Sequence, residues 1–506
     1  MPIHPIGLAA IPVMFLFAQN AVQQMSLRPL WGPLAMSMLG AAALFLVCGA
    51  VLRDWLRAAL LASLLIGLFF SFGHAWNVLA PFLVNRWYLA AAYLLIAVIL
   101  GYLIWRGGRW VPPLTTALNV AVLILIGFNG VRIADFALGT PVSASALRPT
   151  PAVSVDASAP KRDIYYIILD RYASAATLQR VYGHDNRPFL DALEARGFTI
   201  AEEAWANYWK TAFSVVASMS MDYLDPARFD ITDSPTYRPI HAALQDHLPV
   251  PVTLKALGYE YVHLGNIWEP ASTNIDADLT LRYEEVTEFE AALEATTALG
   301  FLLPADAVDA DQESIDKPDL ARRTSLRAFQ WLEESADRPG PTFTFAHILL
   351  PHPPYVFNAD GSMPTDEQRA GRTDEEKYVE QLTWTNRRVL EAIDVLLDAP
   401  AGREPIILLQ ADEGPYPARF AENPTGFDWL GATPEEVQMK FGILNAFHLP
   451  GIDDAEAGVT DRTSPVNEFR IVLNAYFEAD LPILPDLTYL SPDYARMYDF
   501  VPYERP

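Results

Sequence analysis

The chain has 506 residues, of which 51% are apolar, and a formal net charge of −25. Residues 1–150 contain eight Arg, no Lys and two acids, so they carry about +6 and leave about −31 for the rest of the chain. An acidic region of that size excludes nucleic acid as a partner, because phosphate backbones are bound by Lys and Arg. The single cysteine, Cys48, excludes an intrachain disulfide and a cysteine-based zinc site.

Five apolar segments occupy the first 139 residues, and each approaches or exceeds the ~20 residues that a helix needs to cross a bilayer. They are 6–23, 30–51, 58–80, 87–105 and 114–134. The first contains Gln19 and Asn20, but it lacks the basic start and cleavage site of a signal peptide, so we interpret it as a span. The sequence predicts a membrane domain of about five helices over residues 1–139.

The arginines predict the orientation of these helices. A cytoplasmic N-terminus places four arginines in cytoplasmic loops, Arg53, Arg57, Arg106 and Arg109. The outer loops then hold only Arg28 and Arg86, with Arg132 near the outer end of the fifth span. Five spans then export everything after residue 135. Residues 140–162, rich in Pro, Ser and Ala, are expected to be a linker. We predict a multi-pass protein of the cell membrane with an extracytoplasmic C-terminal domain at 163–506.

Short apolar strands alternate with amphipathic helices from Asp163 onward. The strands are expected at 163–169, 259–264, 342–350, 405–411 and 441–449. The helices are expected at 188–196, 211–223, 251–257, 284–298, 319–335, 374–398 and 466–477. Alternation of this kind predicts a three-layer α/β domain with a mainly parallel sheet.

Two of the expected strands run straight into acidic residues. The first ends at Asp170, and the second, about 240 residues later, ends at Asp412 and Glu413. A lone aspartate after a strand is more often a solvated turn residue. Two such strands, however, predict an acidic cluster beyond the carboxyl edge of the sheet, where α/β proteins bind ligands. Adjacent carboxylates repel each other, so a pair held together favours a metal ion.

Two further stretches carry candidate reactive groups. Thr211 stands where the polar stretch after Asn207 enters an apolar helix, and it is interpreted either as an N-cap or as a nucleophilic hydroxyl at a helix N-terminus. His352 follows a strand and precedes two prolines, which makes it a candidate proton donor or phosphate ligand. His347 lies inside that strand, and its position favours buried structure.

The order of these motifs resembles the alkaline phosphatase superfamily, and within it the membrane-bound sulfatase-like hydrolases and transferases that include lipoteichoic acid synthases. The resemblance covers residues 163–490. It implies a metal site formed by Asp170, Thr211, Asp412 and Glu413. It also implies Thr211 as the nucleophile and His352 as a substrate-binding or proton-donating residue, and we expect Asn207 and His347 to bind substrate as well. The family usually has Asp-His-Gly where this chain has Asp412-Glu413-Gly414.

The reaction that the motifs favour is phosphoryl or phosphodiester chemistry. Within residues 163–490, which the resemblance covers, the chain has no Cys/Ser-x-Pro-x-Arg segment, which sulfatases of this fold convert to formylglycine; the match at 158–162 precedes the first expected strand. We therefore expect a membrane-anchored, metal-dependent hydrolase or phospho-substituent transferase that acts on a lipid-linked or glycan phospho-substrate of the cell envelope. The alternative is an inactive domain of the same fold that binds envelope glycan or a partner protein. Because the expected ligands are all oxygen atoms, one manganese or magnesium ion is favoured over zinc.

Overall fold

The computed structural model describes residues 2–505 except 22–23, 25, 84, 139–152, 154, 226–235, 283–287, 300–317 and 401–402. The chain divides into two compact units. The first contains Met1–Pro141 and Val286–Pro318, and the second contains Val142–Glu285 and Asp319–Pro506. Most of the expected linker at 140–162 lies outside the described residues.

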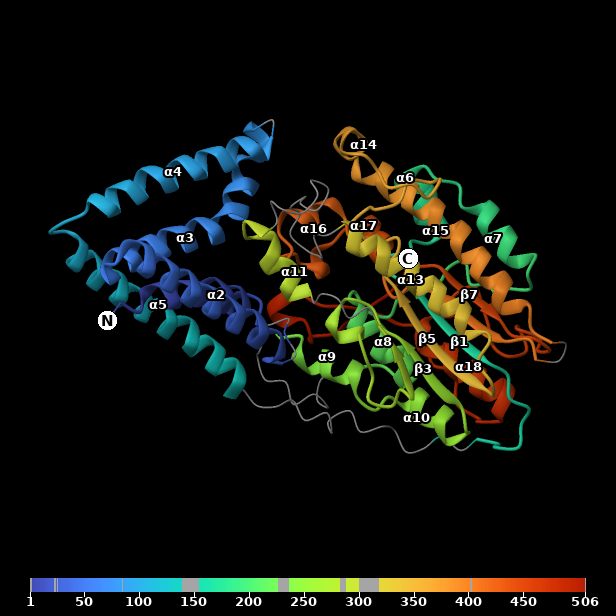
Figure 1. The fold of residues 1–506 in the computed structure, drawn as a ribbon. Helices are drawn as coiled ribbons and strands as arrows, with labels where there is room; N and C mark the ends of the chain where they lie inside the picture. Colours follow the sequence, from blue (N-terminus) through green and yellow to red (C-terminus); the bar gives the residue numbers. More distant parts are fainter. Residues whose placement is uncertain are drawn as a thin grey trace. The chain divides into compact units, whose positions relative to one another are not determined.

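The first unit is helical (Figure 1). Its helices are α1 (His4–Gln19), α2 (Arg28–Leu52), α3 (Trp55–Leu79), α4 (Arg86–Arg106), α5 (Val111–Leu138) and α11 (Glu288–Ala295). Each of the five expected apolar segments forms one of the helices α1 to α5. Four of them, α2 to α5, are long and apolar enough to cross a membrane, whereas α1 is shorter.

The turn between α2 and α3 shows how local chemistry sets the helix ends. Arg53 ends α2 in the left-handed conformation, with φ at 53°. Asp54 then caps α3, because its side chain accepts hydrogen bonds from the backbone N–H groups of Leu56 and Arg57. These two residues reverse the chain within a two-residue connection.

Helix α11 belongs to the first unit although it lies far along the chain. Phe289 of α11 is buried against Phe17 of α1, with ring centroids 5.9 Å apart, and shares a cluster with Leu30 of α2 and Ile133 of α5. The chain after α11 bonds to α3: Gly73 N–H donates to Thr296 O at 3.2 Å, and Ala298 N–H donates to Phe69 O at 2.8 Å. The apolar sequence pattern indicated this helix, at 284–298, but not its association with the membrane helices.

The second unit is built on a seven-stranded sheet with the order β2-β7-β6-β1-β5-β3-β4. The strands are β1 (Ile164–Leu169), β2 (Thr199–Ile200), β3 (Glu260–Leu264), β4 (Leu279–Leu281), β5 (Thr342–Ile348), β6 (Ile406–Gln410) and β7 (Asn445–His448). All neighbours from β6 to β4 pair in parallel, whereas β7 is antiparallel to β6 and to β2. The prediction of a mainly parallel sheet is confirmed. A separate two-stranded sheet pairs β8 (Thr488–Leu490) with β9 (Val501–Tyr503).

Helices cover both faces of the sheet, which gives the expected three layers (Figure 1). One face carries α8 (Thr211–Ser220) and α18 (Pro465–Phe477), and the other carries α13 (Pro318–Ser335) and α15 (Asp374–Leu397). The helices of this unit are α6 (Ala175–Tyr182), α7 (Arg187–Glu194), α8 (Thr211–Ser220), α9 (Arg238–Gln245), α10 (Pro249–Ala256), α13 (Pro318–Ser335), α14 (Asp366–Gly371), α15 (Asp374–Leu397), α16 (Ala418–Glu422), α17 (Pro434–Phe441) and α18 (Pro465–Phe477).

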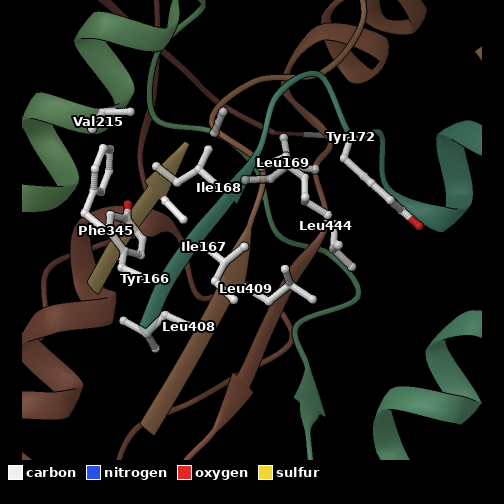
Figure 2. Close-up of a cluster of buried hydrophobic side chains, with 14 of the residues drawn as sticks. Tyr166, Ile167, Ile168, Leu169, Tyr172, Val215, Phe345, Leu408, Leu409 and Leu444 are labelled. Carbon is white, nitrogen blue, oxygen red and sulfur yellow. The ribbon is translucent and has the colours of Figure 1, made fainter. Parts of the chain in front are cut away.

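Strand β1 lies at the centre of the core, and all six of its residues are buried. Successive side chains point to opposite faces of the sheet. Tyr166 lies on the side of β1 that carries Phe345 and Val215 of α8 (Figure 2). Its hydroxyl is 2.6 Å from the hydroxyl of Ser218 in the same helix. The buried strand β1 is thus tied to α8 through Tyr166, and Asp170 is the first residue after its end.

Candidate metal centre

Three adjacent parallel strands, β6, β1 and β5, bring the candidate residues to one edge of the sheet. Ile168 of β1 lies opposite both His347 of β5 and Gln410 of β6. Asp170 follows β1 directly, and its N–H donates to Ile348 O at 3.0 Å. Asp412 comes two residues after Gln410. The register of the sheet therefore places Asp170 and Asp412 next to each other, two residues beyond the level of His347.

Asp170, His347 and Asp412 are buried, and one potential ligand atom from each lies within 4.8 Å of the others. His347 Nε2 is 3.4 Å from Asp170 Oδ2 and 3.9 Å from Asp412 Oδ2. In the described part of the chain, Asp170 Oδ1 and both oxygens of Asp412 have no hydrogen-bond partner. Buried carboxylate oxygens without partners are costly unless a cation compensates them. This cluster can hold a metal ion.

The charges of the cluster lead to the same conclusion. Burial and the charges of Asp170 and Glu413 raise the pKa of Asp412 to about 8, and His347 and Thr211 oppose this by less. The pKa of Asp170 is held below its usual range. Burial acts to raise it, but the nearby His352 and His347 outweigh that effect. Two carboxylates this close favour a shared proton or a shared cation.

Glu413, the residue that departs from the family pattern, forms a buried ion pair. Its Oε1 lies 2.9 Å from Lys440 Nζ and 3.5 Å from Arg171 Nε. Lys440, in α17, is buried, and its ammonium also donates to Gly414 O at 3.1 Å and lies 3.2 Å from the centroid of the Tyr416 ring. The three hydrogens of the ammonium group thus have three partners: the Glu413 carboxylate, the Gly414 oxygen and the Tyr416 ring. Glu413 lies beside the cluster, with its charge compensated.

The sequence did not indicate Lys440 as a residue of the site. Three carboxylates overcompensate one divalent ion, so a site with this ligand set needs a neighbouring cation. Lys440 provides such a cation. Burial lowers its pKa to about 7, against the opposing charge of Glu413. The only signal in the sequence was a lysine directly before an apolar segment.

The turn after Asp170 holds a cation beside the cluster. Arg171 has a φ of 62°, in the left-handed region that residues other than glycine seldom adopt. Tyr378 of α15 stabilises this conformation, because its hydroxyl donates to Arg171 O at 2.8 Å and accepts from Ala173 N–H at 3.1 Å. The Arg171 guanidinium lies over the Tyr416 ring, 4.4 Å from its centroid. A backbone held in an unfavourable region next to a site is typical of functional turns.

Thr211 is the first residue of α8 and is half-buried. The interpretation of Thr211 as an N-cap is wrong, because the N-cap is Lys210, whose side chain makes no capping hydrogen bond. The Thr211 side chain acts to lower the pKa of the Asp412 carboxyl, although burial and the neighbouring acids raise that pKa overall. The hydroxyl therefore lies near Asp412, and the first turn of α8 has N–H groups without a capping side chain.

His352 lies in the turn after β5 and is half-buried. Gln381 of α15 fixes this turn: its Nε2 donates to His352 O at 2.9 Å and its Oε1 accepts from Val356 N–H at 2.7 Å. The His352 ring contributes to the lowered pKa of Asp170. The structure therefore brings His352 near the cluster, together with His347, Asp412 and Thr211.

Asn207 has a different environment. Its Nδ2 donates to Leu487 O at 2.8 Å and to Ser464 Oγ at 3.1 Å, and its Oδ1 accepts from Val466 N–H at 3.0 Å. The amide is fully buried and ties three segments of the chain together. A part for Asn207 in substrate binding stays a prediction.

Comparison with solved structures gives the following similarities. The C-terminal periplasmic domain of EcEptC from Escherichia coli has 13% sequence identity and a TM-score of 0.44, and the match covers 70% of this chain and 97% of that one. The same domain in complex with Zn has 12% identity and a TM-score of 0.43, and the match covers 70% of this chain and 96% of that one. The lipoteichoic acid synthase LtaP from Listeria monocytogenes has 15% identity and a TM-score of 0.40, with 67% and 79% covered. The soluble domain of lipooligosaccharide phosphoethanolamine transferase A from Neisseria meningitidis has 15% identity and a TM-score of 0.38, and the match covers 64% of this chain and 90% of that one.

Searches by sequence found no matching family model and no matching curated protein.

Proposed function

We propose that this protein is a membrane-anchored, metal-dependent transferase or hydrolase that acts on phospho-substituents of cell-envelope lipid or glycan. The observation that supports this most directly is the buried cluster of Asp170, His347 and Asp412 beside the hydroxyl of Thr211. A nucleophile at a helix start, next to a cation site at the carboxyl edge of a parallel sheet, suits attack on phosphorus.

The proposed metal is one manganese or magnesium ion, held by Asp170 and Asp412 with Thr211 and Glu413 as further candidate ligands. Bound there, the ion would lower the pKa of the threonine hydroxyl and neutralise charge on the phosphate. The chain itself supplies the buried oxygens without partners and, through Lys440, compensation for the charge of Glu413.

The reaction is proposed to proceed in two steps. In the first, the Thr211 oxygen loses its proton to water and bonds to phosphorus, while the bond from phosphorus to the leaving oxygen breaks and His352 protonates that oxygen. In the second, the oxygen of water or of an acceptor hydroxyl bonds to phosphorus and gives its proton to His352, while the bond from phosphorus to the Thr211 oxygen breaks and that oxygen regains a proton from water. The site thereby returns to its starting state.

A matched pair of threonine variants tests this function in the purified full-length protein, with bis(4-nitrophenyl) phosphate and Mn²⁺ as the probe. We expect Thr211→Ala to lower turnover by several orders of magnitude and Thr211→Ser to keep part of it. Thr365→Ala is the control. This threonine is a true N-cap in α14, so its loss should cost about 1 kcal/mol of stability and leave turnover unchanged.

Intact-mass measurement should detect a covalent adduct on Thr211 after mixing with substrate. Normal turnover in Thr211→Ala would exclude Thr211 as the nucleophile. The absence of both bound metal and turnover would favour the inactive binding domain instead.

A further inference from the structure

We propose that Asn266 fixes the tautomer of His347, so that the ring donates an N–H to the carboxylates of the metal site and does not bind the metal. The metal is then held by oxygen atoms alone. This inference rests on the proposed metal site and specifies which of its side chains bind the ion.

The orientation of the Asn266 amide is determined by two backbone groups. Its Oδ1 accepts from the backbone N–H of Trp268 at 3.0 Å, and its Nδ2 donates to the backbone O of His347 at 3.1 Å. A backbone N–H can only donate and a backbone oxygen can only accept. Exchanging the oxygen and nitrogen of the amide would therefore break both bonds. Asn266 is itself buried, so water cannot replace them.

This orientation points an amide N–H at the His347 ring. Asn266 Nδ2 lies 2.9 Å from His347 Nδ1, and with Nδ2 a donor, Nδ1 must accept. A neutral imidazole that accepts at Nδ1 carries its hydrogen on Nε2. Turning the ring over would place a carbon against the amide and lose this bond. The hydrogen on Nε2 therefore faces Asp170 and Asp412.

The carboxylate oxygens divide accordingly. His347 Nε2 approaches the Oδ2 atoms of Asp170 and Asp412, at 3.4 Å and 3.9 Å. Asp170 Oδ1 and both oxygens of Asp412 have no hydrogen-bond partner among the described residues. A nitrogen that carries hydrogen has no lone pair for a metal. Asp170 Oδ2 is the oxygen nearest to this N–H, and Asp170 Oδ1 and the Asp412 oxygens remain for the cation.

Metal-binding histidines have the opposite arrangement: the other ring nitrogen carries the hydrogen and donates it to a carboxylate or carbonyl. Oxygen ligands without imidazole favour manganese and magnesium, whereas imidazole favours zinc. Asn266 is therefore a positioning residue that sets metal preference through His347.

Two substitutions in the full-length protein test this, with Mn²⁺ and Zn²⁺ as the probes. Asn266→Asp replaces the donor by an acceptor, so Nε2 should lose its hydrogen and become a ligand. We expect the preference for Zn²⁺ over Mn²⁺ in a competition assay to rise by about 10-fold to 100-fold, the usual range for changes next to metal ligands. X-ray absorption of the bound Zn²⁺ should gain the scattering of an imidazole, and adding His347→Gln should remove it.

His347→Gln alone keeps an N–H donor beside the carboxylates. The X-ray absorption spectrum of Mn²⁺ bound to this variant should therefore be the same as that of Mn²⁺ bound to the wild type. This variant decides the question even if Asn266→Asp does not fold. Loss of an imidazole from the wild-type metal on His347→Gln would overturn the inference and leave the proposed function intact, as would an unchanged metal preference in folded Asn266→Asp. Failure of the wild type to bind either ion would overturn both.

Discussion

At the scale of single residues, the ion pair with Lys440 neutralises the charge of Glu413 beside the candidate metal site. The two negative charges of Asp170 and Asp412 balance one divalent cation, and the charge of Glu413 is balanced by Lys440, whose Nζ lies 2.9 Å away. Because both partners of this pair are buried, neither can be removed alone without leaving a charge in the protein interior. The two residues are expected to depend on each other.

A double-mutant cycle measures that dependence. Glu413→Gln or Lys440→Met alone should lower the free energy of unfolding by about 3–5 kcal/mol, because each removes the nearest partner of a buried charge. The double variant should cost much less than the sum. Arg419→Met is the control in the neighbouring helix, where an Arg419–Glu436 pair 2.7 Å apart has a half-exposed arginine, and it should cost about 0–1 kcal/mol. Additive costs in denaturant unfolding would contradict the pairing.

At this scale the sequence was informative where a residue follows an apolar strand. Asp170 and Asp412 were predicted because the strands before them are continuous apolar runs. His347 was interpreted as buried structure, and it is buried. Its approach to the carboxylates depends on β5 lying beside β1, and strand order is set by packing between segments far apart in the chain. Lys440 and Asn266 act through such contacts, so no local pattern marked them.

At the scale of elements, α15 supports the site from one face of the sheet. Tyr378 holds the turn of Arg171, and one helical turn later Gln381 holds the turn of His352. Both loops follow strands whose ends carry the cluster. The spacing of three residues places the two side chains on one side of the helix. One helix therefore positions two loops that the sheet alone would leave unsupported.

Gln381→Leu tests this support. The substitution leaves the buried N–H of Val356 and the oxygen of His352 without their partner, and an unsatisfied buried group costs about 1–3 kcal/mol. We expect both stability and phosphodiester turnover to fall. The control, His352→Asn, keeps Gln381 and should lower turnover while the melting temperature stays close to wild type. Unchanged turnover in a destabilised Gln381→Leu would show that the turn is not positioned by α15.

The longer elements were predicted well, whereas several of the short ones were missed. The five expected strands agree with the observed ones to within a few residues, because a buried parallel strand is an uninterrupted apolar run. Helices α6, α9 and α17 have eight residues each and were missed, as were β2 and β4, with two and three. Elements this short are stabilised mainly by what they pack against.

At the scale of the whole molecule, α11 bears on the orientation of the membrane helices. It packs near the C-terminal ends of α1 and α5 and the N-terminal end of α2, so these ends lie on one side. An odd number of alternating spans places the C-terminal ends of α1 and α5 on one side, as observed.

Reporter fusions test this topology. A reporter that is active only outside the cytoplasm should give signal when fused after residue 140, because five spans from a cytoplasmic start end outside. Fusion within residues 106–110, between α4 and α5, should give none. The reverse pattern would exclude an extracytoplasmic site and with it any envelope substrate.

The place of α11 in the first unit also affects the order in which the protein is made. The helical unit takes a part of its interior, Phe289, from a segment that the ribosome produces about 150 residues after α5 ends. Until then the aromatic ring of Phe17 has no partner from α11, and the helices are inserted before their assembly is complete. Assembly of the membrane part therefore waits for translation of about 120 residues of the second unit beyond residue 162, and a fragment that stops there is expected to be degraded faster than the full chain.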